Sequence, residues 1–317
     1  MNKDTRNIEH YVAPLEETPL AETDSVKEDV QPLSLWGEAW RNLRRQPLFI
    51  ISALLIVLIL AVAAFPGLFT NASPDEGCSL SNSNGGSTAG HPLGFTFQGC
   101  DVYARVIYGT RASVLVGLLT TIAVVIIGGV LGALAGYYGG WLDAVLARLG
   151  DIFFALPLIL GAIIIMQLPT FRENRTVMTV VFTLLIFGWP QVARITRGAV
   201  ISVRNSDFVV ASRSLGLSKS KALIKHVIPN AMAPVIVIAT ISLGTFIVAE
   251  STLSFLGIGL PPSVMSWGND ISDAQTSLRT NPATLLWPAG ALSITVLSFI
   301  MLGDAVRDAL DPKARKR

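Results

Sequence analysis

The chain has 317 residues, of which 51% are apolar and only 15% carry a charge, and its formal net charge is +2. Soluble domains contain about 25% charged residues, so this composition excludes an ordinary soluble protein and predicts a membrane protein. The net charge is too small to indicate a partner.

The first segment of the chain is polar and acidic. Residues 1–30 hold eight Asp or Glu and three Lys or Arg among few apolar side chains, which predicts a disordered cytoplasmic tail over residues 1–32. The first apolar run begins near residue 47 and is long enough to span a bilayer, so we expect no cleaved signal peptide. Residues 33–70 are predicted to form the first transmembrane helix with its cytoplasmic lead-in.

Apolar runs with almost no charge dominate the chain. Each approaches or exceeds the roughly 20 residues that a helix needs to cross the hydrocarbon. We therefore predict an all-α membrane protein with six transmembrane helices. The six runs are 46–73, 112–142, 152–171, 176–193, 227–249 and 280–303.

Basic residues are unevenly divided between the two sides that six alternating spans define. The side that holds both termini and the segments near 138–150 and 194–230 carries 19 Lys or Arg, and the other side carries 5. Because cytoplasmic loops are enriched in Lys and Arg, both termini are predicted to be cytoplasmic. Residues 71–111 then form an extracytoplasmic loop, 112–310 the core, and 311–317 a basic cytoplasmic tail.

The only two cysteines, Cys78 and Cys100, both fall in the predicted extracytoplasmic loop. An even pair in an oxidising compartment indicates a disulfide, although two free thiols are an alternative because pairing cannot be deduced from sequence.

Small residues recur in the second apolar run, at Gly117, Gly128, Gly129, Gly132 and Gly136. Because small residues allow transmembrane helices to approach closely, this helix is predicted to pack inside a bundle.

Two acidic residues fall in or beside apolar runs. Glu250 lies toward the outer side of its run and Asp304 ends the last run. An ionisable group at this depth is a candidate for gating. A structural hydrogen-bonding role near a helix end is the alternative, and we favour it.

No motif for catalysis or cofactor binding is present in the sequence. It contains no GxxxxGK[ST] motif for ATP, no HExxH and no GxSxG, and its three histidines lack a second ligand at metal-site spacing. We therefore expect a protein that is not an enzyme and holds no cofactor or metal. Two other classes of membrane protein are disfavoured. A secondary transporter would need intramembrane charge pairs, and a receptor would need a signalling domain, and the sequence shows neither feature.

The polar segment at 205–229 lies between two apolar runs. Residues 205–207 can cap a short helix with a small apolar face, and Gly216 is suited to end that helix in left-handed geometry. Ser218 can cap a second short helix over 219–227. Two short helices with a glycine elbow suit a groove on another protein, whereas a basic amphipathic helix on anionic lipid is an equal alternative.

Five blocks in order make the chain resemble ABC-importer permeases, specifically the "C" subunit of the dipeptide, oligopeptide and nickel family. The resemblance covers residues 33–317 and implies the type I importer fold in the bacterial cytoplasmic membrane. The blocks are HPLGFTFQGCDVYARVIYGTRASVLVG (91–117), GYYGGWLDAVLARLGDIFFALPLIL (136–160), 192–230, AESTLSFLGIGLPPSVMSWGNDI (249–271) and 287–313.

The chain departs from the family pattern in two places. In the coupling motif E-A-A-x-x-x-G, Val210 stands at the glutamate and Ser212 at the second alanine. Asp207, one turn earlier, is hypothesised to replace the missing acid. In the 91–117 block, Cys100 stands at a family arginine, which strengthens its pairing with Cys78.

The resemblance implies that the chain forms half of a translocation pathway for peptides, with nickel or another small solute as the alternative cargo. Its partners would be a homologous B-type permease, two ATPase subunits that bind ATP and Mg²⁺, and an extracytoplasmic solute-binding protein. Membrane lipid surrounds it, and no nucleic acid is implied. The residues implied in coupling are Asp207, Val210, Ala211, Ser212, Arg213, Gly216, Lys219 and Pro229.

Overall fold

A computed structural model describes residues 35–310. The predictions for the tails at 1–32 and 311–317 concern residues outside this range. The chain divides into two units, 1–38 and 39–317, and the described part of the first is the beginning of α1 (Leu35–Leu43). All that follows concerns the second unit.

Long helices form the framework of this unit. Among residues 35–310, five helical spans are long and apolar enough to cross a membrane, and a sixth is present if the bent pair α4–α5 counts as one span. Within the described residues, β-structure is limited to two isolated bridges. The long helices are α2 (Pro47–Ala64), α3 (Val102–Tyr138), α7 (Val177–Arg204), α10 (Ile228–Phe255) and α12 (Ala283–Leu310).

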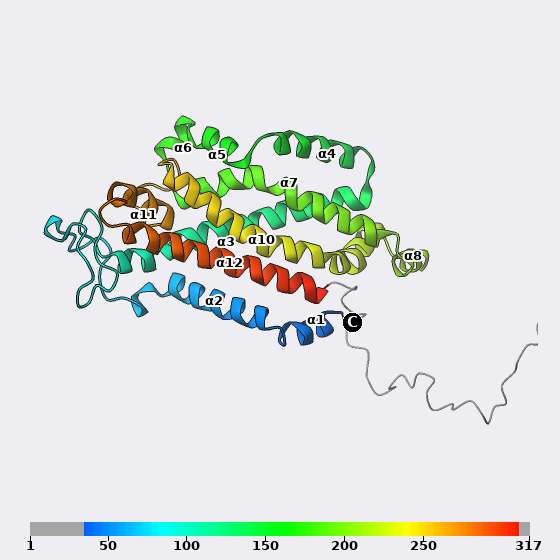
Figure 1. The fold of residues 1–317 in the computed structure, drawn as a ribbon. Coiled ribbons are helices and arrows are strands. Elements are labelled where there is room, and N and C mark those ends of the chain that lie inside the picture. The colour runs from blue at the N-terminus through cyan, green and yellow to red at the C-terminus, as the bar shows by residue number, and fades with distance from the viewer. Residues whose placement is uncertain (1–34, 311–317) are drawn as a thin grey trace, which may run out of the picture. The chain divides into compact units, whose positions relative to one another are not determined.

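The long helices run side by side (Figure 1). α3 packs against α7 and α10, α10 also contacts α7 and α12, and α2 contacts α3 and α12. A buried cluster that includes Val116, Val124, Leu184, Phe246 and Leu253 lies among α3, α7 and α10. Apolar side chains on the outside of the bundle, such as those of α2, are exposed, as expected of a surface that faces lipid.

Glycines on α3 bring that helix against the backbone of α7. A Cβ atom added at Gly128, Gly132 or Gly136 would lie 2.6, 2.3 or 2.8 Å from a carbonyl oxygen of α7. The spacing of four residues places all three on one face of α3. Gly129 has no atom within 4 Å of such a Cβ. The predicted close packing is therefore confirmed for one stripe of glycines, and Gly129 lies outside it.

The boundaries of α3 differ from the prediction at its start. Asp101 caps the helix by accepting a hydrogen bond from the amide of Tyr103 at 3.0 Å, so α3 begins at Val102, inside the segment predicted as loop 71–111. The helix ends at Tyr138, and the two residues that follow, Gly139 and Gly140, have φ of +66° and +64°.

The span predicted at 152–171 is not one straight helix. α4 (Gly140–Ala155) and α5 (Leu158–Met166) meet at an 85° bend. Pro157 lies in the break, where its ring and missing amide prevent a continuous helix. A short α6 (Pro169–Glu173) follows.

Candidate coupling segment and a buried polar cluster

The candidate coupling segment, residues 205–229, begins with the short helix α8 (Asp207–Ser214). Val209 is fully buried against Val200 and Val227 and fixes α8 to the bundle. Ser206 is the N-cap, but its side chain makes no capping hydrogen bond. Asp207 lies in the first turn, where a carboxylate is favourable to the helix dipole.

Gly216 ends α8 as predicted. Its φ is +92°, its amide donates to the carbonyl of Arg213 at 3.0 Å, and the Leu217 amide donates to Ser212 at 3.2 Å. This pair of bonds is the Schellman motif, which satisfies carbonyls that the helix end leaves free. The elbow is therefore fixed by backbone geometry that an L-residue adopts only with strain.

The second predicted short helix is instead the start of a long one. The Ser218 side chain accepts from the amide of Lys221 at 3.4 Å and caps α9 (Lys219–Ala222). A single π-helical turn, η3 (Leu223–Val227), then continues into α10. Because α9, η3 and α10 form one continuous helical span, a displacement at Lys219 has a direct path into the bundle.

Most of the residues implied in coupling face outward. Val210 is 52% exposed and Leu215, one residue before the elbow, is 90% exposed. The apolar face predicted for α8 is thus divided, with Val209 inside the bundle and Val210 and Leu215 outside it. Ser212 is half-buried, and the exposed residues are Asp207, Val210, Ala211, Arg213, Gly216, Lys219 and Pro229.

The end of α7 that leads into the segment is tied to its neighbours. Arg197 forms an ion pair with Asp143 of α4, with its Nη2 2.7 Å from Oδ2. Arg204 donates to the carbonyl of Gly136 at 2.7 Å. These contacts hold the connection to α8 against the ends of α3 and α4.

A second polar region lies at the other end of the bundle. α3 has 37 residues, so its ends are about 55 Å apart at 1.5 Å per residue. Tyr138 at one end lies 3.2 Å from Ser220 of the coupling segment, whereas Arg105 at the other contacts α11 (Trp267–Ala274). Figure 1 shows α8 and α11 at opposite ends of the bundle.

The loop that precedes α3 is closed by a disulfide between Cys78 and Cys100, whose Cα atoms are 4.3 Å apart. The bridge joins the start of the loop to the residue before the Asp101 cap. Asp101 also lies 3.2 Å from Nδ1 of His91. The loop is thereby fastened to the first turn of α3.

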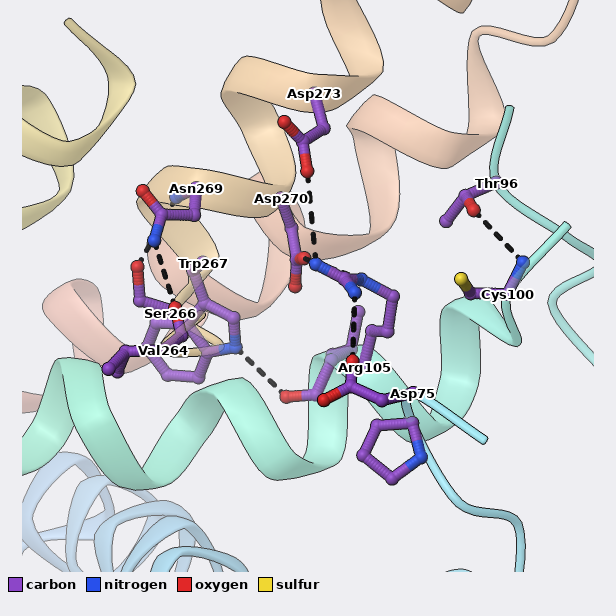
Figure 2. Close-up of polar contacts among 12 residues, drawn as sticks. Asp75, Thr96, Cys100, Arg105, Val264, Ser266, Trp267, Asn269, Asp270 and Asp273 are labelled. Carbon is purple, nitrogen blue, oxygen red and sulfur yellow. Dashed lines mark hydrogen bonds and ion pairs between the residues drawn. The ribbon is translucent and has the colours of Figure 1, made fainter. Parts of the chain in front are cut away.

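Arg105 is the centre of a charged cluster that the sequence analysis did not single out. Its Nε and Nη2 lie 2.8 and 2.6 Å from Oδ1 of Asp270 on α11. The carboxylates of Asp75 and Asp273 lie 3.6 and 3.9 Å from the same guanidinium. Figure 2 shows Asp75 of the loop and the two aspartates of α11 converging on Arg105 of α3.

Asp270 is the most constrained member of this cluster. The pKa of Asp270 is raised to about 6, chiefly by burial and to a smaller extent by the nearby charges of Asp273 and Asp75, although the attraction of Arg105 lowers it. Its Oδ2 is buried and has no hydrogen-bond partner among residues 35–310. The cluster therefore contains more acceptors than its single guanidinium can satisfy.

Backbone-directed hydrogen bonds position α11 next to this cluster. Ser266 caps the helix by accepting from the amide of Asn269 at 3.2 Å, and the Asn269 side chain donates to the carbonyls of Pro261 and Val264. Trp267 is buried, and its Nε1 donates to the carbonyl of Val106 on α3 at 3.0 Å. α11 is therefore fixed against the first turns of α3.

Glu250 is fully buried near the end of α10. It accepts from the hydroxyls of Ser254 at 2.8 Å and Ser251 at 3.2 Å, and the hydroxyls of Ser113 and Ser266 also interact with its side chain. Ser254 in turn accepts from the amide of Leu260. Glu250 thus joins α3, α10 and the N-cap of α11, which supports the structural alternative.

Replacing Glu250 by Leu is expected to lower the free energy of unfolding by about 1–3 kcal/mol, because buried serine hydroxyls lose their acceptor. Glu250→Gln keeps a carbonyl acceptor and is expected to have the smaller effect. The thermal unfolding of both purified variants measures this difference. Equal stability of the two would contradict a hydrogen-bonding role.

Asp304, unlike Glu250, is not buried. Its side chain is exposed on α12, and no ion pair to it is formed within the described part of the chain. The structure therefore does not place it with Glu250. No group of three His, Cys, Asp or Glu suited to a metal ion occurs among residues 35–310.

Comparison with known proteins agrees with this architecture. The family model described as "Binding-protein-dependent transport system inner membrane component" matches residues 128–316, and "N-terminal TM domain of oligopeptide transport permease C" matches 34–84. A solved inward-facing methionine ABC transporter has a similar fold, with a TM-score of 0.52 and 18% identity over 65% of this chain and 96% of that one.

Curated relatives match over nearly their whole length. A dipeptide transport system permease protein of Alkalihalophilus pseudofirmus is 35% identical, over 94% of this chain and 96% of the relative. An oligopeptide transport system permease protein of Bacillus subtilis is 35% identical over 92% and 94%. A glutathione transport system permease protein of Pectobacterium atrosepticum is 32% identical over 88% and 92%.

Permeases of this kind work in the bacterial cytoplasmic membrane with a second permease, ATPase subunits and a substrate-binding protein. The matched family model, the near-complete coverage of the relatives and the helical bundle lead to one conclusion: the chain belongs to the family of inner-membrane permease components of binding-protein-dependent ABC importers.

Proposed function

We propose that this chain is one of two permease subunits of an ATP-driven importer of short peptides, and that residues 205–229 couple it to an ATPase subunit. The peptide cargo is inferred from relatives named for dipeptide, oligopeptide and glutathione transport. ATP and Mg²⁺ would bind to the ATPase partners, and the chain itself would catalyse no reaction.

The exposed α8 with its fixed elbow carries the coupling proposal. The side chains of Val210 and Leu215 point away from the bundle, while Val209 anchors the same helix to it. A partner that moves α8 would displace α9 and hence α10, since these are continuous. Binding of nucleotide can shift the bundle only if it favours one of its conformations over the other.

The distribution of basic residues and the position of the disulfide support an orientation in which the coupling segment faces the cytoplasm. Arg213 and Lys219 are exposed at the end that carries the coupling segment, where basic residues favour the cytoplasm. The Cys78–Cys100 disulfide lies at the opposite end and suits an oxidising compartment. A solute-binding protein would therefore deliver peptide at the end that carries α11.

Purification through a tag on this chain alone, after co-expression with its co-encoded neighbours, tests the proposal. We expect a second permease and ATPase subunits to co-purify, and ATP hydrolysis to increase when peptide-loaded binding protein is added. The control is the binding protein without peptide. A stable chain that purifies alone while supporting uptake would contradict the proposal and favour a secondary transporter.

A further inference from the structure

A cavity of about 330 Å³ lies beside the Arg105 cluster. Its charged lining comes from Arg105, Asp270 and Asp273, and its apolar walls include Val102, Val106 and Pro288. This volume is within the range of cavities that hold small molecules, and its combination of apolar walls with a few charged groups is typical of them.

The charges beside the cavity are unbalanced. Three carboxylates, from Asp75, Asp270 and Asp273, surround one guanidinium. Within residues 35–310, Arg105 is the only cation within ion-pairing distance of any of them. Asp270 is nine-tenths buried and lines the cavity, and its Oδ2 has no hydrogen-bond partner in the described part of the chain. A buried carboxylate with a free acceptor gains by binding a second cation.

The same arrangement discriminates among ligands. A ligand carboxylate is disfavoured, because Asp270 already engages the guanidinium through two nitrogens and two further negative charges lie beside it. A compact metal dication is also disfavoured, because the fixed positive charge of Arg105 would repel it. A primary ammonium supplies three donors and a single charge, and the apolar walls accommodate a short side chain attached to it.

We propose that this cavity binds a primary ammonium group on a small, partly apolar molecule, with the carboxylates of Asp273 and Asp270 as acceptors. If the proposed import function holds, that molecule is a short peptide and the ammonium is its α-amino group. Free amines share the same chemistry, and the experiment below separates the two sources.

Binding is measured on the full complex in nanodiscs, without nucleotide or binding protein, by calorimetric titration with three probes. These are alanyl-phenylalanine, its N-acetylated form and phenethylamine. We expect the free dipeptide to bind at least about tenfold more tightly than the acetylated one, since acetylation removes the charge. Equal affinity of these two would overturn the proposal without any need for a variant.

Asp273→Asn is expected to weaken binding of the free dipeptide by about fivefold, the size typical of an exposed ion pair. Asp151→Asn is the matched control, because its carboxylate is exposed to the same degree, 54% against 55% for Asp273, and is also ion-paired, but belongs to α4. Equal effects of the two variants would contradict the assignment of Asp273.

The phenethylamine titration decides the source of the ammonium. If phenethylamine binds as tightly as the dipeptide, the ammonium site is supported but its assignment to peptides is contradicted. Ammonium-selective binding in a complex that imports no peptide would contradict the proposed function alone. Peptide import without ammonium selectivity would contradict this site alone.

Discussion

Gly132→Val is expected to prevent the chain from forming a stable bundle. A Cβ at this position would lie 2.3 Å from the carbonyl oxygen of Ala193 and 3.0 Å from its Cα. The obstacle is backbone of α7, which no side-chain rotation can remove, so α3 and α7 must separate along their shared length. Overpacking typically costs 1–3 kcal/mol, and we expect a loss at or above about 3 kcal/mol here.

The neighbouring glycine provides a matched control for this effect. Gly129 belongs to the same helix, but a Cβ there meets nothing within 4 Å. Gly129→Val should therefore express and unfold like the unchanged protein. The yield of monodisperse protein from membranes and its thermal unfolding midpoint measure both variants. Similar behaviour of the two would show that the approach of α3 to α7 does not stabilise the bundle.

Gly216→Val is expected to leave the chain inserted and assembled but to uncouple ATP hydrolysis from peptide uptake. The position is exposed and open, with nothing within 4 Å of an added Cβ, so no clash follows. The cost arises from the backbone, because φ of +92° is strained for a β-branched residue by about 1–3 kcal/mol. Relief of that strain breaks the Schellman bonds and changes the angle between α8 and α9.

We expect peptide uptake by the Gly216→Val complex to fall by at least about tenfold, the effect of 1.4 kcal/mol on the competent conformation, while nucleotide hydrolysis continues. Gly216→Asn should retain more uptake, because Asn tolerates left-handed geometry best among side-chain residues. Gly198→Val controls for bulk, since Gly198 lies within helix α7 in open space. Normal coupled uptake by Gly216→Val would refute the role of the elbow.

Local patterns in the sequence predicted much of this protein. Apolar runs predicted the membrane helices because a helix must satisfy its own backbone in lipid. Gly216 and Ser218 predicted the end of one helix and the start of the next, since both depend on residues within a single turn. The glycines of the second apolar run predicted close packing because small residues let helices approach one another. The structure shows which of them meet α7, namely Gly128, Gly132 and Gly136, which share one helix face.

Tertiary contacts decided the rest. Hydropathy assigned Arg105 to a loop because it counts a charge as a barrier to burial, yet carboxylates from Asp75 and Asp270, distant in sequence, make its burial in α3 favourable. The 85° bend between α4 and α5 was missed because the hydropathy of a run does not register the position of a single proline such as Pro157. Glu250 is bonded by two serines of its own helix, but its contacts with Ser113 of α3 and Ser266 beside α11 depend on the tertiary fold, and no local pattern records which helices become neighbours.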